Sequence, residues 1–213
     1  MNSRTFGLMD CLIGEIDRAI KILWNPARSS RQPPAPQEGE RLADEPWRVE
    51  SARLMRVNHS GEVAAQALYQ GQALTARDPT LSDSMRHAAA EEMDHLAWCE
   101  QRLEELNGRT SLLNPLWYAG SFAIGALAGA LGDRISLGFV AETEKQVESH
   151  LRDHMERLPA ADNRSRAIIL QMTHDEMRHG AEANALGAKE LPFVLQRAMH
   201  LASRTLTRGS YWL

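Results

Sequence analysis

The pattern Glu-x-x-His occurs twice in this chain, and each copy stands on a stripe of apolar residues that repeat with helical spacing. The first copy is EMDH at 92–95, and the second is EMRH at 176–179. On a helix, residues three positions apart project from the same face. A carboxylate that is buried without a partner is strongly destabilising, so it must be paired or bound to a metal ion. The two stripes therefore predict a helical interior that holds charged groups.

Helical periodicity extends over almost all of the chain, and no segment alternates apolar and polar residues long enough to predict a strand. We expect an amphipathic helix at 6–24, long helices at about 47–77, 80–107, 115–157 (with an interruption) and 161–186, and an amphipathic helix at about 191–208. Short connections between long helices favour an antiparallel arrangement, although the second and third could be joined by a longer crossover. The sequence predicts an all-α fold, an antiparallel four-helix bundle with additional N- and C-terminal amphipathic helices.

The domain organisation follows from one change in composition. Residues 27–46 are polar and carry four prolines, which is typical of a flexible linker. We therefore divide the chain into an N-terminal amphipathic helix at 1–26, a proline-rich linker at 27–46 and a bundle domain at 47–213. The whole chain of 213 residues is long enough for one domain with an appendage.

Charge and composition limit the function classes. The formal net charge of −4 does not indicate a nucleic-acid partner. Two cysteines are too few for a disulfide framework and suit a reducing compartment, and no secretory signal is indicated. The glycine-rich motifs of nucleotide-binding folds are absent from the sequence, so any redox chemistry needs an external electron donor.

Each Glu-x-x-His motif is preceded by a glutamate on the apolar face of the previous helix. Glu62 lies thirty residues before Glu92, and Glu144 lies thirty-two residues before Glu176. The chain thus repeats one unit, a helix with an inward glutamate followed by a helix with Glu-x-x-His. Glu148 is one turn from Glu144, and spacing alone does not decide between these two residues.

The doubled unit matches the ligand pattern of di-iron and di-manganese sites in ferritin-like bundles, so we expect a ferritin-like four-helix bundle. Four carboxylates carry four negative charges, which two divalent cations neutralise, and a mixture of carboxylate oxygen and imidazole nitrogen suits iron or manganese. So few ligands per metal leave open positions for O₂. The alternative, exposed helix charges with incidental histidines, is less consistent with the apolar stripes. The candidate metal ligands are Glu62, Glu92, His95, Glu144 or Glu148, Glu176 and His179.

Several neighbouring residues are weaker candidates. Glu91 and Asp175 precede the two motif glutamates, where an acid can hold the free N–H of a ligand histidine. Asp94 and Arg178 occupy equivalent places in the two motifs and could pair between helices. Solvated helix charges explain these four residues equally well. Ordinary packing or a wet surface is the better interpretation of three more residues, His59, Tyr69 and His150.

An uncharged segment at 111–132 indicates contact with a membrane. It is nearly long enough to cross a bilayer, but Asn114-Pro115 and several glycines make it a poor spanning helix. We expect it to dip into one leaflet, and the alternative is a wholly buried core helix. From residue 189 onward, four basic side chains oppose only Glu190, which favours anionic lipid headgroups.

Four stretches carry a resemblance to a known family: LMRVNHSGEVAAQALYQGQ (54–72), EEMDHLAWCEQRL (91–103), NPLWYAGSFAIGALAG (114–129) and DEMRH (175–179). From about residue 47 to the C-terminus, the chain resembles the demethoxyubiquinone hydroxylases, the di-iron hydroxylases of ubiquinone biosynthesis. The resemblance implies two iron ions, and it implies Glu144 rather than Glu148 as a ligand.

The resemblance also implies a reaction and its setting. The substrate would be a membrane-bound polyprenyl benzoquinol whose ring is hydroxylated with O₂ and an external electron donor. We expect a peripheral protein on the cytoplasmic face of the bacterial inner membrane. Its partners would be the membrane surface and either proteins of ubiquinone biosynthesis or a second copy of the chain. The alternatives are a ferritin-like or rubrerythrin-like oxidase or peroxidase, and a non-enzymatic helical protein at a membrane.

Overall fold

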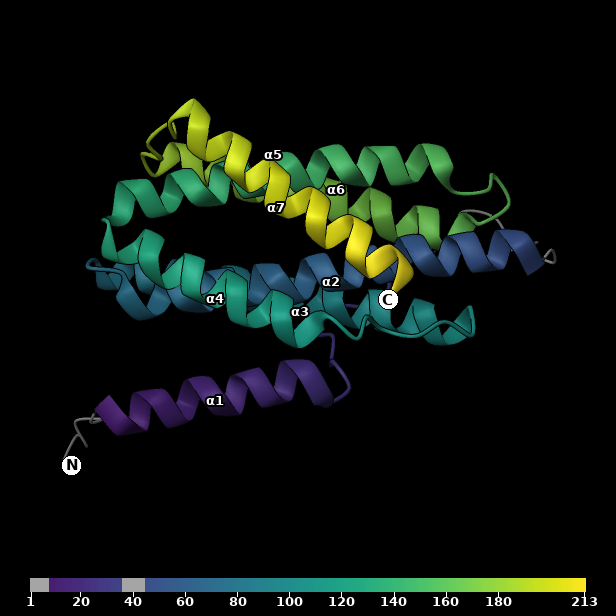
Figure 1. Ribbon diagram of the computed structural model, residues 1–213, viewed down its shortest axis with the longest axis horizontal. Helices are drawn as coiled ribbons and strands as arrows, with labels where there is room; N and C mark the ends of the chain where they lie inside the picture. The colour runs from purple at the N-terminus through teal and green to yellow at the C-terminus, as the bar shows by residue number, and fades with distance from the viewer. Residues whose placement is uncertain (1–7, 36–44) are drawn as a thin grey trace.

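The computed structural model describes residues 8–35 and 45–213, and all regular structure in these residues is helical. Figure 1 shows the helices lying largely along one direction, with α1 set apart beside the others. This arrangement confirms the predicted all-α class. The helices are α1 (Leu8–Trp24), α2 (Glu45–Thr75), α3 (Pro79–Glu105), α4 (Asn114–Ala130), α5 (Asp133–Arg157), α6 (Asn163–Ala185) and α7 (Phe193–Trp212).

The central bundle consists of α2, α3, α5 and α6. In it α2 packs on α3, α3 on α6, α6 on α5, and α5 on α2. The short connections 76–78 and 158–162 make two antiparallel hairpins, α2–α3 and α5–α6. Each hairpin contains one copy of the repeated unit, so the bundle brings both copies of the motif into a common interior.

Helix capping sets where the two motif-bearing helices begin. The Asp78 side chain accepts a hydrogen bond from Thr80 N at 2.8 Å, with Pro79 at the first helical position. Asp162 caps α6 in the same way and accepts from Ser165 N at 2.9 Å. Each motif glutamate follows its helix start by thirteen residues. Each Glu-x-x-His motif therefore lies near the middle of its helix.

The predicted interruption within 115–157 is confirmed, because the helix ends at Ala130 and a new helix begins at Asp133. Gly132 between them has φ of 121°, in the region that favours glycine. The first of these helices, α4, crosses from α3 to α5 while packing along α2. The glycines of α4 allow a very close approach to α2. A Cβ atom on Gly125 would lie 2.2 Å from the carbonyl oxygen of Leu68.

The outer face of α4 is apolar and exposed. Leu116, Leu127 and Leu131 are each at least 60% exposed. The alternative of a wholly buried core helix is therefore wrong. No helix in the described part of the chain is long and apolar enough to cross a membrane.

We expect Gly125→Ala to lower the free energy of unfolding by about 1–3 kcal/mol, because the added methyl group must push α2 and α4 apart. Gly120 on the same helix is a matched control, since nothing lies within 4 Å of a Cβ built there. Gly120→Ala should stabilise the protein by about 0.5–1 kcal/mol through helix propensity. Urea unfolding measures both changes. Equal effects of the two variants would contradict the close α2–α4 contact.

The remaining helices lie on the outside of the bundle. Ile22 of α1 packs against Val63 of α2 and Tyr118 of α4. The C-terminal helix α7 runs to Trp212, four residues beyond its predicted end, and packs on α2 and α5. Residues 1–7 and 36–44 fall outside the described part of the chain. The domain boundaries at 26 and 46 therefore stay predictions.

His59 of α2 gives the fold a calculable pH dependence. It is buried, Asn114 Nδ2 donates to its Nδ1 at 3.3 Å, and burial lowers its pKa to about 4. Histidine in an unfolded chain has a pKa of about 6.5, so between about pH 4 and pH 6.5 the unfolded state binds more protons than the folded state. Stability must fall as the pH falls through this window. By pH 4.5, His59 should cost about 2–3 kcal/mol.

Urea unfolding at pH 7 and pH 4.5 measures this loss. His59→Gln should lose less stability than the wild type between the two values, because glutamine does not titrate. The exposed His87 offers a control, and His87→Gln should behave as the wild type does. An unchanged loss in His59→Gln would contradict the assignment.

Candidate metal centre

The bundle interior brings together six buried side chains that sequence analysis predicted as metal ligands. Each contributes one potential ligand atom to one or both of two groups, and within each group these atoms lie within 4.8 Å of one another. Both groups contain Glu92 and Glu176, so the groups adjoin and share two carboxylates. The first group is Glu62, Glu92, His95 and Glu176, and the second is Glu92, Glu144, Glu176 and His179.

The structure separates the two glutamates of α5 that spacing left equivalent. The Glu144 side chain is buried and accepts a hydrogen bond from the Tyr69 hydroxyl. The Glu148 side chain is 22% exposed and pairs with Arg152 on the outside of the helix. Glu144 therefore faces the carboxylate cluster, and Glu148 does not belong to either group.

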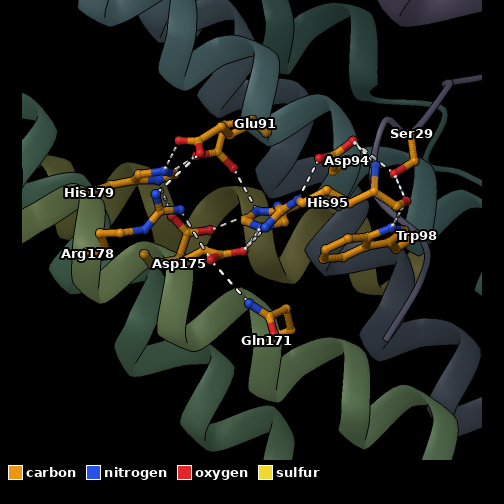
Figure 2. A network of polar contacts seen from close by, with 12 residues as sticks. Ser29, Glu91, Asp94, His95, Trp98, Gln171, Asp175, Arg178 and His179 are labelled. Carbon is orange, nitrogen blue, oxygen red and sulfur yellow. Dashed lines mark hydrogen bonds and ion pairs between the residues drawn. The ribbon is translucent and has the colours of Figure 1, made fainter. Parts of the chain in front are cut away.

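The two histidines have matching orientations. His95 Nδ1 lies 2.8 Å from Glu92 Oε2, and its Nε2 lies 2.9 Å from Asp175 Oδ2. His179 Nδ1 lies 3.0 Å from Glu92 Oε1, and its Nε2 lies 2.9 Å from Glu91 Oε2. Each ring thus directs Nδ1 to the interior and donates from Nε2 to an acid on the opposite helix, as Figure 2 shows. When such a ring gives up one proton, these outer hydrogen bonds keep the remaining proton on Nε2 and leave the lone pair on Nδ1.

The acids that precede the motif glutamates therefore hold the outer nitrogens of the histidines, as the sequence suggested for Glu91 and Asp175. Each does so across the bundle rather than within its own motif. Arg178 contacts Glu91 Oε1 and Asp175 Oδ1, each at 3.3 Å. The suggested pairing of Arg178 with Asp94 is wrong, because Asp94 is bound by Arg31 of the N-terminal segment.

Sequence reasoning assigned Tyr69 to ordinary packing, whereas the structure places its hydroxyl on Glu144. The available signal was its position seven residues after Glu62, on the same helical face. Burial and the Glu144 carboxylate raise the pKa of Tyr69 well above its usual range, so the hydroxyl keeps its proton and donates it. The tyrosine thereby fixes the orientation of one carboxylate of the cluster.

The buried carboxylates of the cluster favour a nearby positive charge. Burial raises the pKa of Glu62 and Glu144 well above the usual range, and the neighbouring carboxylates add to the effect. Burial also opposes ionisation of Glu92, but His95 and His179 hold its pKa below the usual range. Although burial disfavours its charged form, the Glu176 and Glu92 carboxylates raise the pKa of His179 to about 12.

Three buried polar atoms test whether metal ions fit here. Glu92 Oε1 and Glu176 Oε2 lie 3.0 and 3.4 Å from His179 Nδ1, and none of the three atoms forms a well-aligned hydrogen bond with the described residues. They converge with further carboxylate oxygens, and a cation that displaces the Nδ1 proton of each histidine would meet a lone pair there. Converging lone pairs in a dry interior are stabilised by cations, and this mixture of oxygen and nitrogen donors suits iron or manganese. The residues therefore fit a buried metal centre.

An apolar groove of about 590 Å³ lies beside the cluster, between α2, α4, α5 and α7. Its wall includes Gly61 and Thr143, which are adjacent in sequence to Glu62 and Glu144. His150 also lines the groove, and its Nδ1 is buried without a well-aligned hydrogen bond to any residue in the described part of the chain. Burial lowers the pKa of His150 to about 4, so this imidazole is neutral at physiological pH.

The four-helix bundle with its doubled Glu and Glu-x-x-His site defines the class, a ferritin-like protein with a carboxylate–histidine centre able to bind metal. The family described as ubiquinone biosynthesis protein COQ7 matches residues 49–210. The chain belongs to this family.

Similar proteins from bacteria cover nearly the full chain. The 3-demethoxyubiquinol 3-hydroxylase of Ralstonia pickettii (strain 12J) is 54% identical over a gapped alignment of 215 positions, which covers 96% of this chain and 99% of the relative. The protein of the same name from Legionella pneumophila (strain Corby) is 50% identical over 212 residues, which cover 99% of this chain and 100% of the relative. The match therefore extends to the N-terminal residues that precede the family match.

Proposed function

We propose that this chain is an O₂-dependent di-iron monooxygenase that hydroxylates the ring of a membrane-bound polyprenyl quinol, 3-demethoxyubiquinol, in ubiquinone biosynthesis. The observation that carries the proposal is the pair of adjoining carboxylate–histidine groups beside an apolar groove. Family membership and the names of the relatives support the reaction. The C–H bond of the ring becomes C–OH, the second oxygen atom leaves as water, and an external donor supplies two electrons.

The ligand assignment follows the two groups. Glu62 and His95 would hold one iron ion, Glu144 and His179 would hold the other, and both ions would share Glu92 and Glu176. Bound iron would supply the activation of O₂. The protein fixes the ligands, since Tyr69 holds one carboxylate and acids on opposite helices hold the two imidazoles.

The groove is the proposed substrate site. Its apolar walls suit a polyprenyl chain, and a ring bound against Gly61 and Thr143 would lie near Glu62 and Glu144. His150 Nδ1 can form a hydrogen bond with a quinol hydroxyl, because the imidazole is neutral and this atom makes no well-aligned hydrogen bond with the described residues. Burying this nitrogen against a hydroxyl would satisfy it and would orient the ring.

We also propose that the protein binds peripherally to the cytoplasmic face of the bacterial inner membrane. The groove opens between α4 and α7, which carry exposed apolar side chains that include Leu116, Leu127, Val194 and Leu201. The basic residues of α7 would lie near anionic headgroups. A long-tailed quinol could then enter the groove without crossing water.

Isotope labelling tests the proposed reaction. The iron-loaded protein, a reductant and 3-demethoxyubiquinol are incubated under ¹⁸O₂, and the product is analysed by mass spectrometry. We expect one ¹⁸O atom in the product ring. An iron-loaded protein that consumes hydrogen peroxide and leaves the quinol unchanged would instead be the rubrerythrin-like alternative. Failure of the labelled atom to enter the ring would overturn the proposal.

Vesicle flotation tests the membrane surface, for which we expect two separable contributions. Reversing the charge of Arg197, Arg204 and Arg208 should weaken binding to anionic vesicles mainly at low salt, by about 1 kcal/mol per residue. Leu127→Ser with Leu131→Ser should weaken it at every salt concentration, because apolar burial is not screened. Leu170 on α6 is also an exposed leucine, and Leu170→Ser is the control that should change nothing. If Leu170→Ser weakens binding as much as the α4 changes do, the assigned surface is wrong.

A further inference from the structure

The N-terminal segment Ala27–Arg31 leaves α1 and lies against the motif-bearing helix α3. Ala27 N donates to Glu100 Oε2 at 2.7 Å. Ser29 Oγ and Ser30 N donate to Asp94 Oδ1 at 2.9 and 2.6 Å. Figure 2 shows Ser29 beside Asp94, next to His95. This part of the expected linker is therefore bound to the residue that adjoins one of the candidate ligands.

Arg31 at the end of this segment connects both halves of the bundle. Its Nε donates to Asp94 Oδ2 on α3 at 2.6 Å, and its Nη1 donates to Asp175 Oδ2 on α6 at 2.9 Å. The guanidinium lies over the Trp98 ring, 4.8 Å from its centroid. The planar fork of arginine suits this geometry, because two donors on one rigid group reach two acids.

Asp175 Oδ2 is also the atom that accepts the hydrogen bond from His95 Nε2 at 2.9 Å. Arg31 and His95 therefore donate to the same oxygen. The other oxygen, Oδ1, accepts from Gln171 Nε2 at 3.2 Å and from Arg178 Nη2 at 3.3 Å. Besides His95, three side chains contact Asp175, and the contact of Arg31 is the shortest of these three. Of the three, Arg31 alone comes from outside the bundle.

The two motifs differ at the position before the histidine, and Arg31 compensates for the difference. The second motif has Arg178 there, which contacts the acid that holds His179. The first motif has Asp94, a further negative charge that pairs with the same guanidinium as Asp175 does. Arg31 pairs with this aspartate and adds a second arginine contact, beside that of Arg178, to the acid that holds His95. The N-terminal segment thus supplies the cation that the extra acid of the first motif requires.

We propose that Arg31 is a positioning residue of the metal centre, which acts through Asp175 to keep His95 Nδ1 directed at the carboxylate cluster. The inference rests on the proposed metal centre. Loss of Arg31 leaves Asp94 and Asp175 close together without their shared cation. Asp175 can then turn away from His95, and the ring loses the contact that fixes its orientation and raises its basicity.

Cobalt(II) binding to the metal-free full-length chain tests this role without using activity. Ligand-field absorption reports the binding of each equivalent and its coordination. The wild type should bind two equivalents per chain. Arg31→Ala should bind one of them about tenfold more weakly, with an altered absorption band. Arg28, three residues earlier and exposed, is the matched control, and Arg28→Ala should bind as the wild type does.

A double-mutant cycle with Asp175→Asn separates positioning from a general loss of structure. If Arg31 acts through Asp175, then Arg31→Ala should change the cobalt affinity less than about twofold in the Asp175→Asn background. Arg31→Lys keeps the charge but lacks the fork, and its cobalt affinity should lie between those of the wild type and Arg31→Ala. Circular dichroism of each metal-free variant checks its helicity.

The outcomes distinguish this role from the metal centre itself. Two equivalents bound by Arg31→Ala with unchanged affinity and spectrum would overturn the role of Arg31 alone. An equal loss in both backgrounds would also overturn it, because the effect would not pass through Asp175. A wild-type chain that binds no cobalt would overturn the metal centre and this role with it.

Discussion

Glu144→Ala should lower hydroxylation by more than about 100-fold, whereas Glu148→Ala should keep most of the activity. Both changes remove the same carboxylate from the same helix, one turn apart. Glu144 is buried in the cluster and held by Tyr69, while Glu148 pairs with Arg152 outside it. Only the first change removes a donor that a metal ion would share with the rest of the cluster.

Two measurements on each variant check this expectation. Iron per chain after reconstitution reports the ligand, and turnover of the quinol reports the reaction. Glu148→Ala should bind the wild-type amount of iron, and Glu144→Ala should bind less. Tyr69→Phe should lie between the two, because the carboxylate remains but loses its orienting hydroxyl. Iron loss in Glu148→Ala with retention in Glu144→Ala would reverse the assignment on α5.

The acids of the candidate site could be predicted from the sequence because each is a charged residue within an apolar helical stripe. An acid on an apolar helical stripe needs a partner wherever the stripe packs, so Glu62, Glu92 and Glu176 stand out before any fold is known. Glu144 and Glu148 differ by one turn on one side of a helix. Which of them points inward depends on how α5 is rotated against its neighbours, and only the packed bundle fixes that rotation.

Contacts between distant segments were beyond the reach of the sequence. Arg31 meets Asp94 across 63 residues and Asp175 across 144 residues, and nothing in a polar, proline-rich stretch indicates either contact. The close packing of α4 on α2 was hidden for another reason. Small and apolar residues occur on all sides of α4, so the sequence shows no polar face opposite an apolar one. The packed face at Gly125 therefore cannot be told from the exposed face at Leu127 by periodicity.

Loading with two divalent metal ions should raise the melting temperature markedly, and the physical cause is the state of the metal-free cluster. Burial raises the pKa of Glu62 and Glu144 above their unfolded values. A carboxyl group of this kind stabilises the fold at low pH and loses that contribution as the pH rises through its folded pKa. The metal-free protein therefore either retains protons in the cluster or holds like charges together, and metal ions remove this conflict.

The size of the shift follows from linkage. Free metal at about 1,000 times the dissociation constant adds about 4 kcal/mol to stability for each site, and thus about 8 kcal/mol for two independent sites. This gain corresponds to roughly 16–32 °C in melting temperature for a chain of this size. Binding should also release protons, and the release should be measurable in weakly buffered solution. The gain on loading should be larger at pH 8 than at pH 6, because metal ions then compete with fewer protons.

Glu62→Gln makes the expectation specific to charge. It keeps the shape of the side chain and removes one negative charge from the cluster, so the metal-free variant should melt above the metal-free wild type. With metal the order should reverse, because the variant lacks a ligand and gains less from loading. Calorimetry of both proteins, with and without metal, gives the four melting temperatures. One contrary result is a wild type that melts at the same temperature with and without metal. The other is that the variant and the wild type keep the same order of melting temperatures in both states. Either result would show that these carboxylates do not bind metal ions in the folded interior.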